Sequence, residues 1–305
     1  MTRRGATALA GVLPIDKPAG MTSHDVVALV RNLTGEGRVG HAGTLDPAAT
    51  GLLVVLVGPC TRLEPYLSGT SKRYEARIAF GCETDTDDAE GRVTRNAPTP
   101  DSLFDRELAA ESVQRLVGTF EQVPPAYSAI KVDGRVAHRE ARAGRAVELA
   151  SRVITVHQAD LLGVDPTART WDVAFCVSKG TYVRALARDI GRASGCAAHL
   201  CALRRTESGH LDLRQAHSLD EVREAADKGR IEALFADEVA ALGMPVFQTE
   251  EESIANGRTL SPPLEFQVDE GSTVAIAVDG RLAGIYRVSD HHLVPEVVLP
   301  GRKDA

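Results

Sequence analysis

Six consecutive apolar residues, Leu52–Val57 (LLVVLV), lie between Gly51 and Gly58, and three of them are valines. A short, β-branched run of this kind is typical of a buried strand. It is far shorter than the roughly 18 apolar residues that a membrane-spanning helix requires. We therefore expect a globular protein with this strand in its core and no membrane partner.

Other strands and helices are indicated by periodic patterns along the chain. Apolar residues alternate in Tyr74–Phe80 and in Trp171–Val177, which predicts two strands. Val274–Val278 and Leu282–Val288 flank an Asp-Gly pair, which predicts a hairpin with a tight turn. Capping residues and helical periodicity predict helices from Ser23 to Gly35, around Leu108–Val117, over Thr181–Arg192 and after Ser218.

The net charge of −7 is unevenly distributed along the 305 residues. Phe235–Ala305 carries five basic and twelve acidic residues, so the rest of the chain is neutral. Two segments of this remaining part are basic. Lys131–Arg152 carries six basic and three acidic residues, and Lys179–Arg205 carries six basic residues and one acidic residue. Since charges are screened beyond roughly 8 Å at physiological salt, local basic patches allow an RNA partner despite the negative total.

Five cysteines without a CxxC pair argue against a disulfide framework and a zinc ribbon, and favour a reducing cytoplasm. The N-terminus has no apolar core of an export signal, so a cytoplasmic location is expected. The nine histidines show no HExxH spacing, and we expect no metal site.

Asp46 lies in a glycine-rich loop, Gly40–Gly51, that leads into the buried strand. An Asp-Pro pair is common at helix starts, so a structural role for Asp46 as a helix cap is one interpretation. The glycines and His41 around it leave room for a ligand close to the backbone, which favours a functional carboxylate. The glycine spacing matches neither a P-loop nor a dinucleotide fingerprint. The residues alone leave both interpretations open.

Arg184, Arg188 and Arg192 recur every four residues and form one basic stripe on the predicted helix. With Thr181 as the cap, Arg184 lies in the first turn, where the helix dipole disfavours a cation by about 0.3–1 kcal/mol. A residue that breaks this rule indicates a partner elsewhere, most simply a carboxylate. A solvated basic face explains Arg188 and Arg192 better than it explains Arg184.

Tyr74 and Tyr182 are two of only five tyrosines, and each has basic residues nearby in sequence. A tyrosine beside a strand is often simply packed in the core. Next to cations it can also present its ring to a nucleobase, a stacking worth roughly 1–3 kcal/mol per base.

Blocks of motif-like sequence follow one another over about residues 11–210: DKPAGMTS (16–23), GHAGTLDPAATG (40–51), KRYEA (72–76), the loop 81–91 with Thr84-Asp85-Thr86, VPPAYSAIK (123–131), SKGTYVR (178–184) and HLCALRRT (199–206). Together they resemble the TruB family of tRNA pseudouridine-55 synthases. The resemblance implies isomerisation of one uridine in the T-loop of tRNA, with no cofactor or metal.

The resemblance also assigns roles at the reacting base. Asp46 is the implied catalytic carboxylate, acting as a nucleophile or as a base at C2′ of the uridine. Arg184 is implied to pair with it and keep it ionised. Tyr74 is implied to stack on the base and to assist deprotonation at C5. Tyr182 and Leu203 resemble pocket-wall residues.

Two further roles rest on the resemblance. His41 is similar to the residue that occupies the space left by the flipped base, and Lys17 lies in a motif that supports the catalytic loop. By residue type alone, we would expect His41 to be a plain loop histidine, Leu203 a core residue and Lys17 a solvated one.

The basic stretch about 123–152 resembles the family's mobile insertion, with Lys131, Arg139 and Arg142 as expected phosphate contacts. A solvated surface is the alternative for these three residues. The implied fold is mixed α/β (α+β), a pseudouridine synthase fold with a largely antiparallel central sheet and a small C-terminal PUA-like β module. We expect a catalytic domain at residues 1–238, a C-terminal domain at residues 239–305, and a monomer that binds the T-arm of tRNA.

Two alternative functions are weighed against this one. A non-catalytic tRNA-binding protein or tRNA folding chaperone would use the same surface, but binding alone needs no carboxylate facing a polyanion. A hydrolase with an aspartate nucleophile would need a water-activating base and a phosphate or acyl site, and the sequence offers neither.

Overall fold

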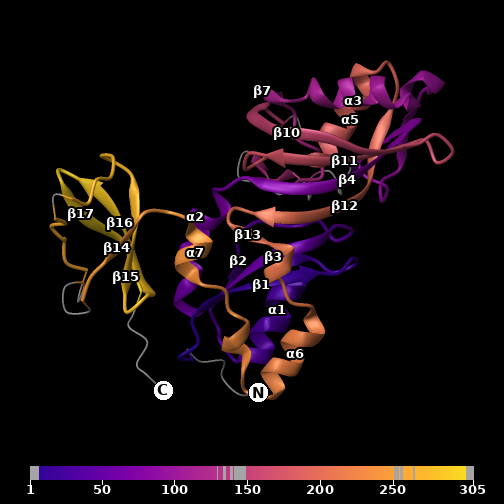
Figure 1. Cartoon of the computed structure of the whole chain (residues 1–305). Coiled ribbons are helices and arrows are strands. Elements are labelled where there is room, and N and C mark those ends of the chain that lie inside the picture. Colours follow the sequence, from indigo (N-terminus) through magenta and orange to yellow (C-terminus); the bar gives the residue numbers. More distant parts are fainter. Residues whose placement is uncertain are drawn as a thin grey trace. The chain divides into compact units, whose positions relative to one another are not determined.

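The computed structural model describes residues 7–128, 130–132, 135–137, 140, 149–250, 254, 257–263 and 265–299. The chain divides into two compact units (Figure 1). The first unit combines Met1–Thr70 with Glu207–Ala305, and the second consists of Ser71–Thr206. The expected boundary between residues 238 and 239 stays a prediction.

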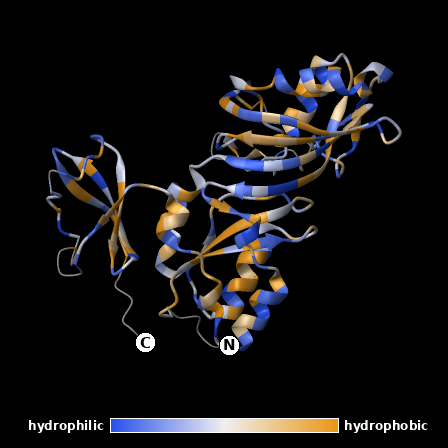
Figure 2. Cartoon of the chain, in the orientation of Figure 1, coloured by the Kyte–Doolittle hydropathy of each residue, from blue (hydrophilic) through white to orange (hydrophobic). Residues whose placement is uncertain are grey.

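The first unit contains the apolar run as strand β3 (Thr50–Val57). It pairs antiparallel with β1 (Gly11–Lys17) along its whole length, and β2 (Val39–His41) also pairs antiparallel with it. All six residues of the run are at most 1% exposed, which confirms the buried strand. Figure 2 colours the chain by hydropathy, with hydrophobic residues in orange. The first unit also contains the short strand β13 (Leu211–Asp212), which pairs with the end of β12 (Ala198–Ser208).

Helices of the first unit pack around these strands. α1 (Ser23–Thr34) contacts α6 (Leu219–Asp227), and α6 contacts β1. The predicted capping box at Ser218 is confirmed, because its hydroxyl accepts the backbone N–H of Glu221. Two shorter helices are α2 (Glu64–Ser68) and α7 (Glu238–Leu242).

The C-terminal strands form a separate four-stranded sheet in the order β14-β15-β16-β17. They are β14 (Val246–Gln248), β15 (Thr273–Val278), β16 (Arg281–Ser289) and β17 (His292–Val298). The predicted hairpin is confirmed, since β15 and β16 are antiparallel and Asp279 and Gly280 have φ of 50° and 77°. Two positive φ values in succession are typical of the turn that matches the twist of paired strands.

The second unit is built on strands in the order β12-β4-β11-β10-β7, in which the pairs from β4 to β7 are antiparallel. Its strands are β4 (Lys72–Phe80), β7 (Gly118–Gln122), β10 (Arg152–Asp165), β11 (Thr170–Val177) and β12 (Ala198–Ser208), of which the last two residues belong to the first unit. Trp171, Val173 and Phe175 of β11 are buried on one face, as the alternation predicts. Helices α3 (Arg106–Gln114) and α5 (Val183–Ala193) pack on that face (Figure 1).

These elements confirm the expected mixed α/β fold with a separate C-terminal sheet, in which β14 and β15 are parallel. Smaller elements of the second unit are two hairpins, β5 (Cys82–Thr84) with β6 (Val93–Asn96) and β8 (Lys131–Val132) with β9 (Arg135–Val136). None of the helices in the described ranges is long and apolar enough to cross a membrane.

Three helix boundaries differ from the sequence-based expectations. Thr22, not Ser23, caps α1. α3 ends at Gln114, because Gly118 with a φ of 140° already begins β7. α5 begins at Val183 after Tyr182, rather than at Thr181. Each boundary differs from its expected position by only a few residues. The sequence indicates where a helix ends, but several neighbouring residues could occupy the terminal position.

Candidate active site

Asp46 lies half-buried in an extended loop, and no helix follows it. The interpretation of Asp46 as a helix cap is therefore wrong. Its backbone carbonyl accepts the N–H of Ala49 at 3.1 Å, which closes a turn over Pro47. The loop then enters β3 at Thr50.

The Lys17 side chain holds the segment after Asp46. Lys17 is fully buried, and its ammonium donates to the carbonyl oxygens of Pro18, Met21 and Pro47 at 3.0, 2.7 and 3.2 Å. The expectation of a solvated Lys17 is wrong, since three carbonyls replace its water shell. Pro47 directly follows Asp46, so this buried cation fixes the backbone next to the carboxylate.

Ser23 holds the segment before Asp46. Its buried hydroxyl donates to the carbonyl oxygen of Leu45 at 3.1 Å and accepts the N–H of Leu45 at 2.9 Å. Sequence reasoning missed this role because it assigned the hydroxyl to the helix cap. The signal was present in the sequence, because Thr22 and Asp25 form a capping box without Ser23.

His41 ends β2 at the start of the same loop. Its ring meets the ring of His24 edge-on, with centroids 5.7 Å apart. The first unit therefore contains Asp46 and His41 in one loop, and the Lys17 side chain supports that loop at Pro47.

The second unit holds Tyr74, Leu203 and Tyr182. Tyr74 on β4 and Leu203 on β12 are half-buried and pack against the hydrophobic core of this unit. Neither is fully enclosed, so core packing does not account for their whole surface.

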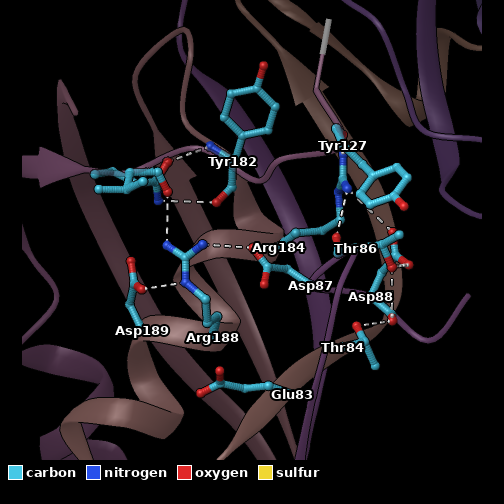
Figure 3. Close-up of polar contacts among 12 residues, drawn as sticks. Glu83, Thr84, Thr86, Asp87, Asp88, Tyr127, Tyr182, Arg184, Arg188 and Asp189 are labelled. Atoms are coloured by element: carbon cyan, nitrogen blue, oxygen red, sulfur yellow. Dashed lines mark hydrogen bonds and ion pairs between the residues drawn. The ribbon is translucent and has the colours of Figure 1, made fainter. Parts of the chain in front are cut away.

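Tyr182 is positioned by a buried glutamine that the sequence analysis missed. The Gln122 side chain accepts the Tyr182 N–H at 2.9 Å and donates to its carbonyl oxygen at 3.2 Å (Figure 3). The guanidinium carbon of Arg152 lies 5.7 Å from the centre of the Tyr182 ring, within the range of a cation–π contact. The Tyr182 side chain thus extends from a fixed backbone with a cation beside it.

Arg184 lies in the first turn of α5 and is only 6% exposed. It donates to the carbonyl oxygens of Thr86 and Tyr127 at 2.8 and 3.1 Å (Figure 3). The same guanidinium lies 3.6 Å from a carboxylate oxygen of Asp88. The prediction that Arg184 has partners away from its helix is confirmed.

The interpretation of Arg188 as part of a solvated face is wrong. Arg188 is 8% exposed and pairs with Asp87 at 2.8 Å and with Asp189 at 2.9 Å. Burial raises the pKa of Asp87 to about 6, although Arg188 and Arg184 act in the opposite direction. Arg192 is half-exposed, but it too binds a buried carboxylate, that of Glu83 at 2.8 Å.

The three arginines of α5 therefore bind acidic residues of one loop, Glu83–Gly91. Two arginines, Arg192 and Arg95, donate to Glu83. The hydrogen bonds from Arg192, followed by those from Arg95, lower the pKa of Glu83 to about 2, against the opposing effect of burial. The loop is acidic because it neutralises a buried helix face, a role that its turn-rich composition did not reveal.

Replacing Glu83 by Gln is expected to lower the free energy of unfolding by about 3 kcal/mol near neutral pH, following the shift of the Glu83 pKa from 4.5 to about 2. Because this pKa is depressed in the folded state, the stabilisation is present above about pH 4.5 and is lost as the pH falls toward 2. Urea unfolding of the unmodified protein and of Glu83→Gln, near pH 7 and near pH 3, measures the difference in the free energy of unfolding. An equal difference at both pH values would contradict the prediction.

The remaining predicted residues are placed as follows. Asp46 belongs to the first unit and Arg184 to the second, so their predicted pairing stays a prediction. Lys131 begins β8, whereas Arg139 and Arg142 lie outside the described residues. Sequence reasoning missed Ser23, Gln122 and Asp88.

Comparison with known families gives two matches to this chain. The model described as TruB family pseudouridylate synthase (N terminal domain) matches residues 31–183. The model described as tRNA pseudouridylate synthase B C-terminal domain matches residues 184–238.

Among curated proteins, the chain is similar to two that are named tRNA pseudouridine synthase B. The protein of Thermobifida fusca is 43% identical over 95% of this chain and 99% of its own length. The protein of Corynebacterium aurimucosum is 45% identical over 83% of this chain and 84% of its own.

Two solved structures have a similar fold. A chain of a Cbf5-Nop10-Gar1 complex has a TM-score of 0.69 and 22% identity, over 91% of this chain and 78% of that one. A chain of an H/ACA RNP bound to a substrate RNA containing 2'-deoxyuridine has a TM-score of 0.70 and 21% identity, over 96% of this chain and 86% of that one.

Proposed function

The chain belongs to the TruB family of pseudouridylate synthases, and on this premise we propose that it isomerises uridine 55 in the T-loop of tRNA. It is a tRNA pseudouridine synthase, as its high-coverage relatives are named. The observation that carries the assignment of the site is the Asp46 loop, whose backbone is held on both sides by the buried side chains of Lys17 and Ser23. Such rigid mounting is what a catalytic carboxylate requires.

The reaction changes bonds but not composition. The N1–C1′ bond of the uridine breaks, the base turns, and a C5–C1′ bond forms. The proton at C5 leaves and N1 gains one, so no redox partner is needed. We assign the carboxylate of Asp46 to the attack at C1′ or to proton removal at C2′, and the pairing with Arg184 to keeping that carboxylate ionised.

The base must leave its stack to reach Asp46, at a cost of a few kcal/mol that is smallest in a loop. In our proposal the half-buried ring of Tyr74 stacks on it and assists the loss of the C5 proton. Tyr182 and Leu203 form the pocket walls, and His41 occupies the space that the base leaves. The fixed backbone of Tyr182 supports this role, since a wall must keep its place when the base turns.

The proposed partner is the T-arm of tRNA, recognised by shape and phosphate contacts. Lys131, Arg139 and Arg142 remain the proposed phosphate contacts. A single chain supplies every residue to which we give a role, so we propose that the enzyme acts as a monomer in the cytoplasm, where tRNA is found.

Release of tritium from C5 of uridine tests the function. A tRNA transcript labelled at C5 is expected to release one equivalent of label with the protein, and a transcript with cytosine at position 55 is expected to release none. Binding without release would instead favour the non-catalytic tRNA-binding protein. Release from the cytosine-55 transcript would contradict the assigned position.

Neutralising Lys131, Arg139 and Arg142 together is expected to make tRNA binding less sensitive to salt. Each phosphate contact contributes about −0.7 to −0.9 to the log–log slope of affinity against salt, so the slope should become shallower by roughly two to three units. Binding titrations over a series of salt concentrations measure it. An unchanged slope would show that other residues contact the phosphates.

A further inference from the structure

Arg184 and Arg188, one helical turn apart on α5, each connect the same two segments of the chain (Figure 3). Arg184 donates to the carbonyl oxygen of Thr86 on one side and to that of Tyr127 on the other. Arg188 donates to the carboxylate of Asp87 at 2.8 Å and to the carbonyl oxygen of Val123 at 2.9 Å. The two arginines thus form parallel bridges between residues 86–88 and residues 123–127.

The two bridges share a tripeptide. Thr86 and Asp88 face Arg184, whereas Asp87 between them binds Arg188. Asp87 has a φ of 60°, a left-handed conformation that is uncommon for residues other than glycine. A short ion pair with Arg188 holds Asp87 in this conformation. Any shift of Asp87 must also move its neighbours Thr86 and Asp88.

We propose that Asp87 and Arg188 form a positioning pair that sets the guanidinium of Arg184 for the isomerisation. The pair does not contact the uridine. It acts through Thr86–Asp88 and through the segment Val123–Tyr127, the two segments that carry the groups in contact with Arg184. This inference rests on the proposed function, in which Arg184 serves the catalytic carboxylate.

A comparison within the helix separates this role from simple stabilisation. Arg192, the next arginine on the same face, also binds a buried carboxylate of the loop, that of Glu83. Glu83 stands at the start of the loop and also receives hydrogen bonds from Arg95. Arg188, by contrast, binds Asp87, which lies between Thr86 and Asp88, the two loop residues in contact with Arg184. It also binds Val123, in the segment that contains Tyr127, the third partner of Arg184. Loss of Arg192 therefore removes an ion pair, whereas loss of Arg188 removes an ion pair and a bridge.

The test compares the full-length variants Arg188→Met, Asp87→Asn and Arg192→Met with the unmodified protein. Asn keeps the size of Asp and tolerates a positive φ, so Asp87→Asn removes charge with little change to the backbone. Single-turnover release of C5 tritium at saturating tRNA gives the rate constant, and titration gives the affinity for tRNA. Thermal unfolding of each variant shows whether it is folded at the assay temperature. Assays near pH 8 keep Asp87 ionised, because its pKa is about 6.

We expect Arg188→Met to lower the rate constant by about 10- to 100-fold while the affinity changes less than about threefold, since a misplacement of 1 Å can cost that much in rate. Asp87→Asn should lower the rate constant in the same way. A variant that carries both Asp87→Asn and Arg188→Met should have a rate constant no lower than that of Arg188→Met alone, because the two residues act as one unit. Arg192→Met should keep the rate within about threefold despite a lower melting temperature.

A folded Arg188→Met or Asp87→Asn variant with the original rate would overturn the positioning pair. So would equal losses of rate for Arg188→Met and Arg192→Met, which would reduce the pair to a stabilising contact. If Arg188→Met does not fold, the near-isosteric Asp87→Asn variant decides between these outcomes. Absence of tritium release from the unmodified protein would instead reject the proposed function, so the two failures are distinguishable.

Discussion

The Asp46→Asn variant is expected to lose isomerisation almost completely while still binding tRNA. An amide cannot act as the nucleophile or base that the reaction requires, so the single-turnover rate should fall by more than about 10⁴-fold. Affinity should change little, because RNA recognition is distributed over many phosphate and shape contacts. Asn has nearly the same volume as Asp, and the buried side chains of Lys17 and Ser23 hold the loop on both sides of this position. The variant should therefore fold normally.

Asp105→Asn is the matched control. Asp105 is a true helix cap, which accepts the N–H groups of Glu107 and Leu108 at the start of α3. Asn caps helices about as well as Asp, so this variant should keep both activity and stability. C5 tritium release and filter binding measure both variants. Substantial turnover by Asp46→Asn would remove Asp46 from the chemistry.

The second large effect is expected for Arg184→Met. Methionine leaves the carbonyl oxygens of Thr86 and Tyr127 without their donor and removes the cation beside Asp88. Breaking such a buried network costs roughly 3–5 kcal/mol. If that energy orients the reacting groups, its loss lowers the rate by about 10²- to 10⁴-fold. Arg184→Lys should recover only part of this rate, because an ammonium cannot reproduce the planar fork that binds two separated carbonyls.

Single-turnover tritium release from Arg184→Met, Arg184→Lys and Arg192→Met checks this order. The sequence pattern alone predicts that Arg188 and Arg192 are both tolerant of substitution. For Arg188 the structure contradicts this prediction, because its guanidinium is buried against Asp87. If Arg184→Met turned over as fast as Arg192→Met, Arg184 would have only a structural role.

Much of the fold could be predicted from local patterns. The buried run Thr50–Val57, the alternating strand Thr170–Val177 and the hairpin around Asp279 are each encoded by residues that are neighbours in the chain. The Asp46 loop stood out for the same reason, since its glycines and the strand after it are contiguous in the chain.

The supports of the site could not be predicted in this way. Lys17 and Pro47 are 30 residues apart, and Arg188 and Asp87 are 101 residues apart. A lysine or an arginine has the same appearance in a sequence whether water or a carbonyl satisfies its hydrogen bonds. The difference is decided by which backbone the fold brings within about 3 Å.

Local residue patterns therefore predicted individual strands, and the ordered motifs predicted the family, which the comparisons confirm. Three features became known only from the tertiary structure: Lys17 is buried, Ser23 binds Leu45 instead of capping a helix, and Arg188 binds Asp87. In all three cases a polar side chain has lost contact with water. Once packing removes water from a polar group, its partner must come from whatever segment the fold places beside it.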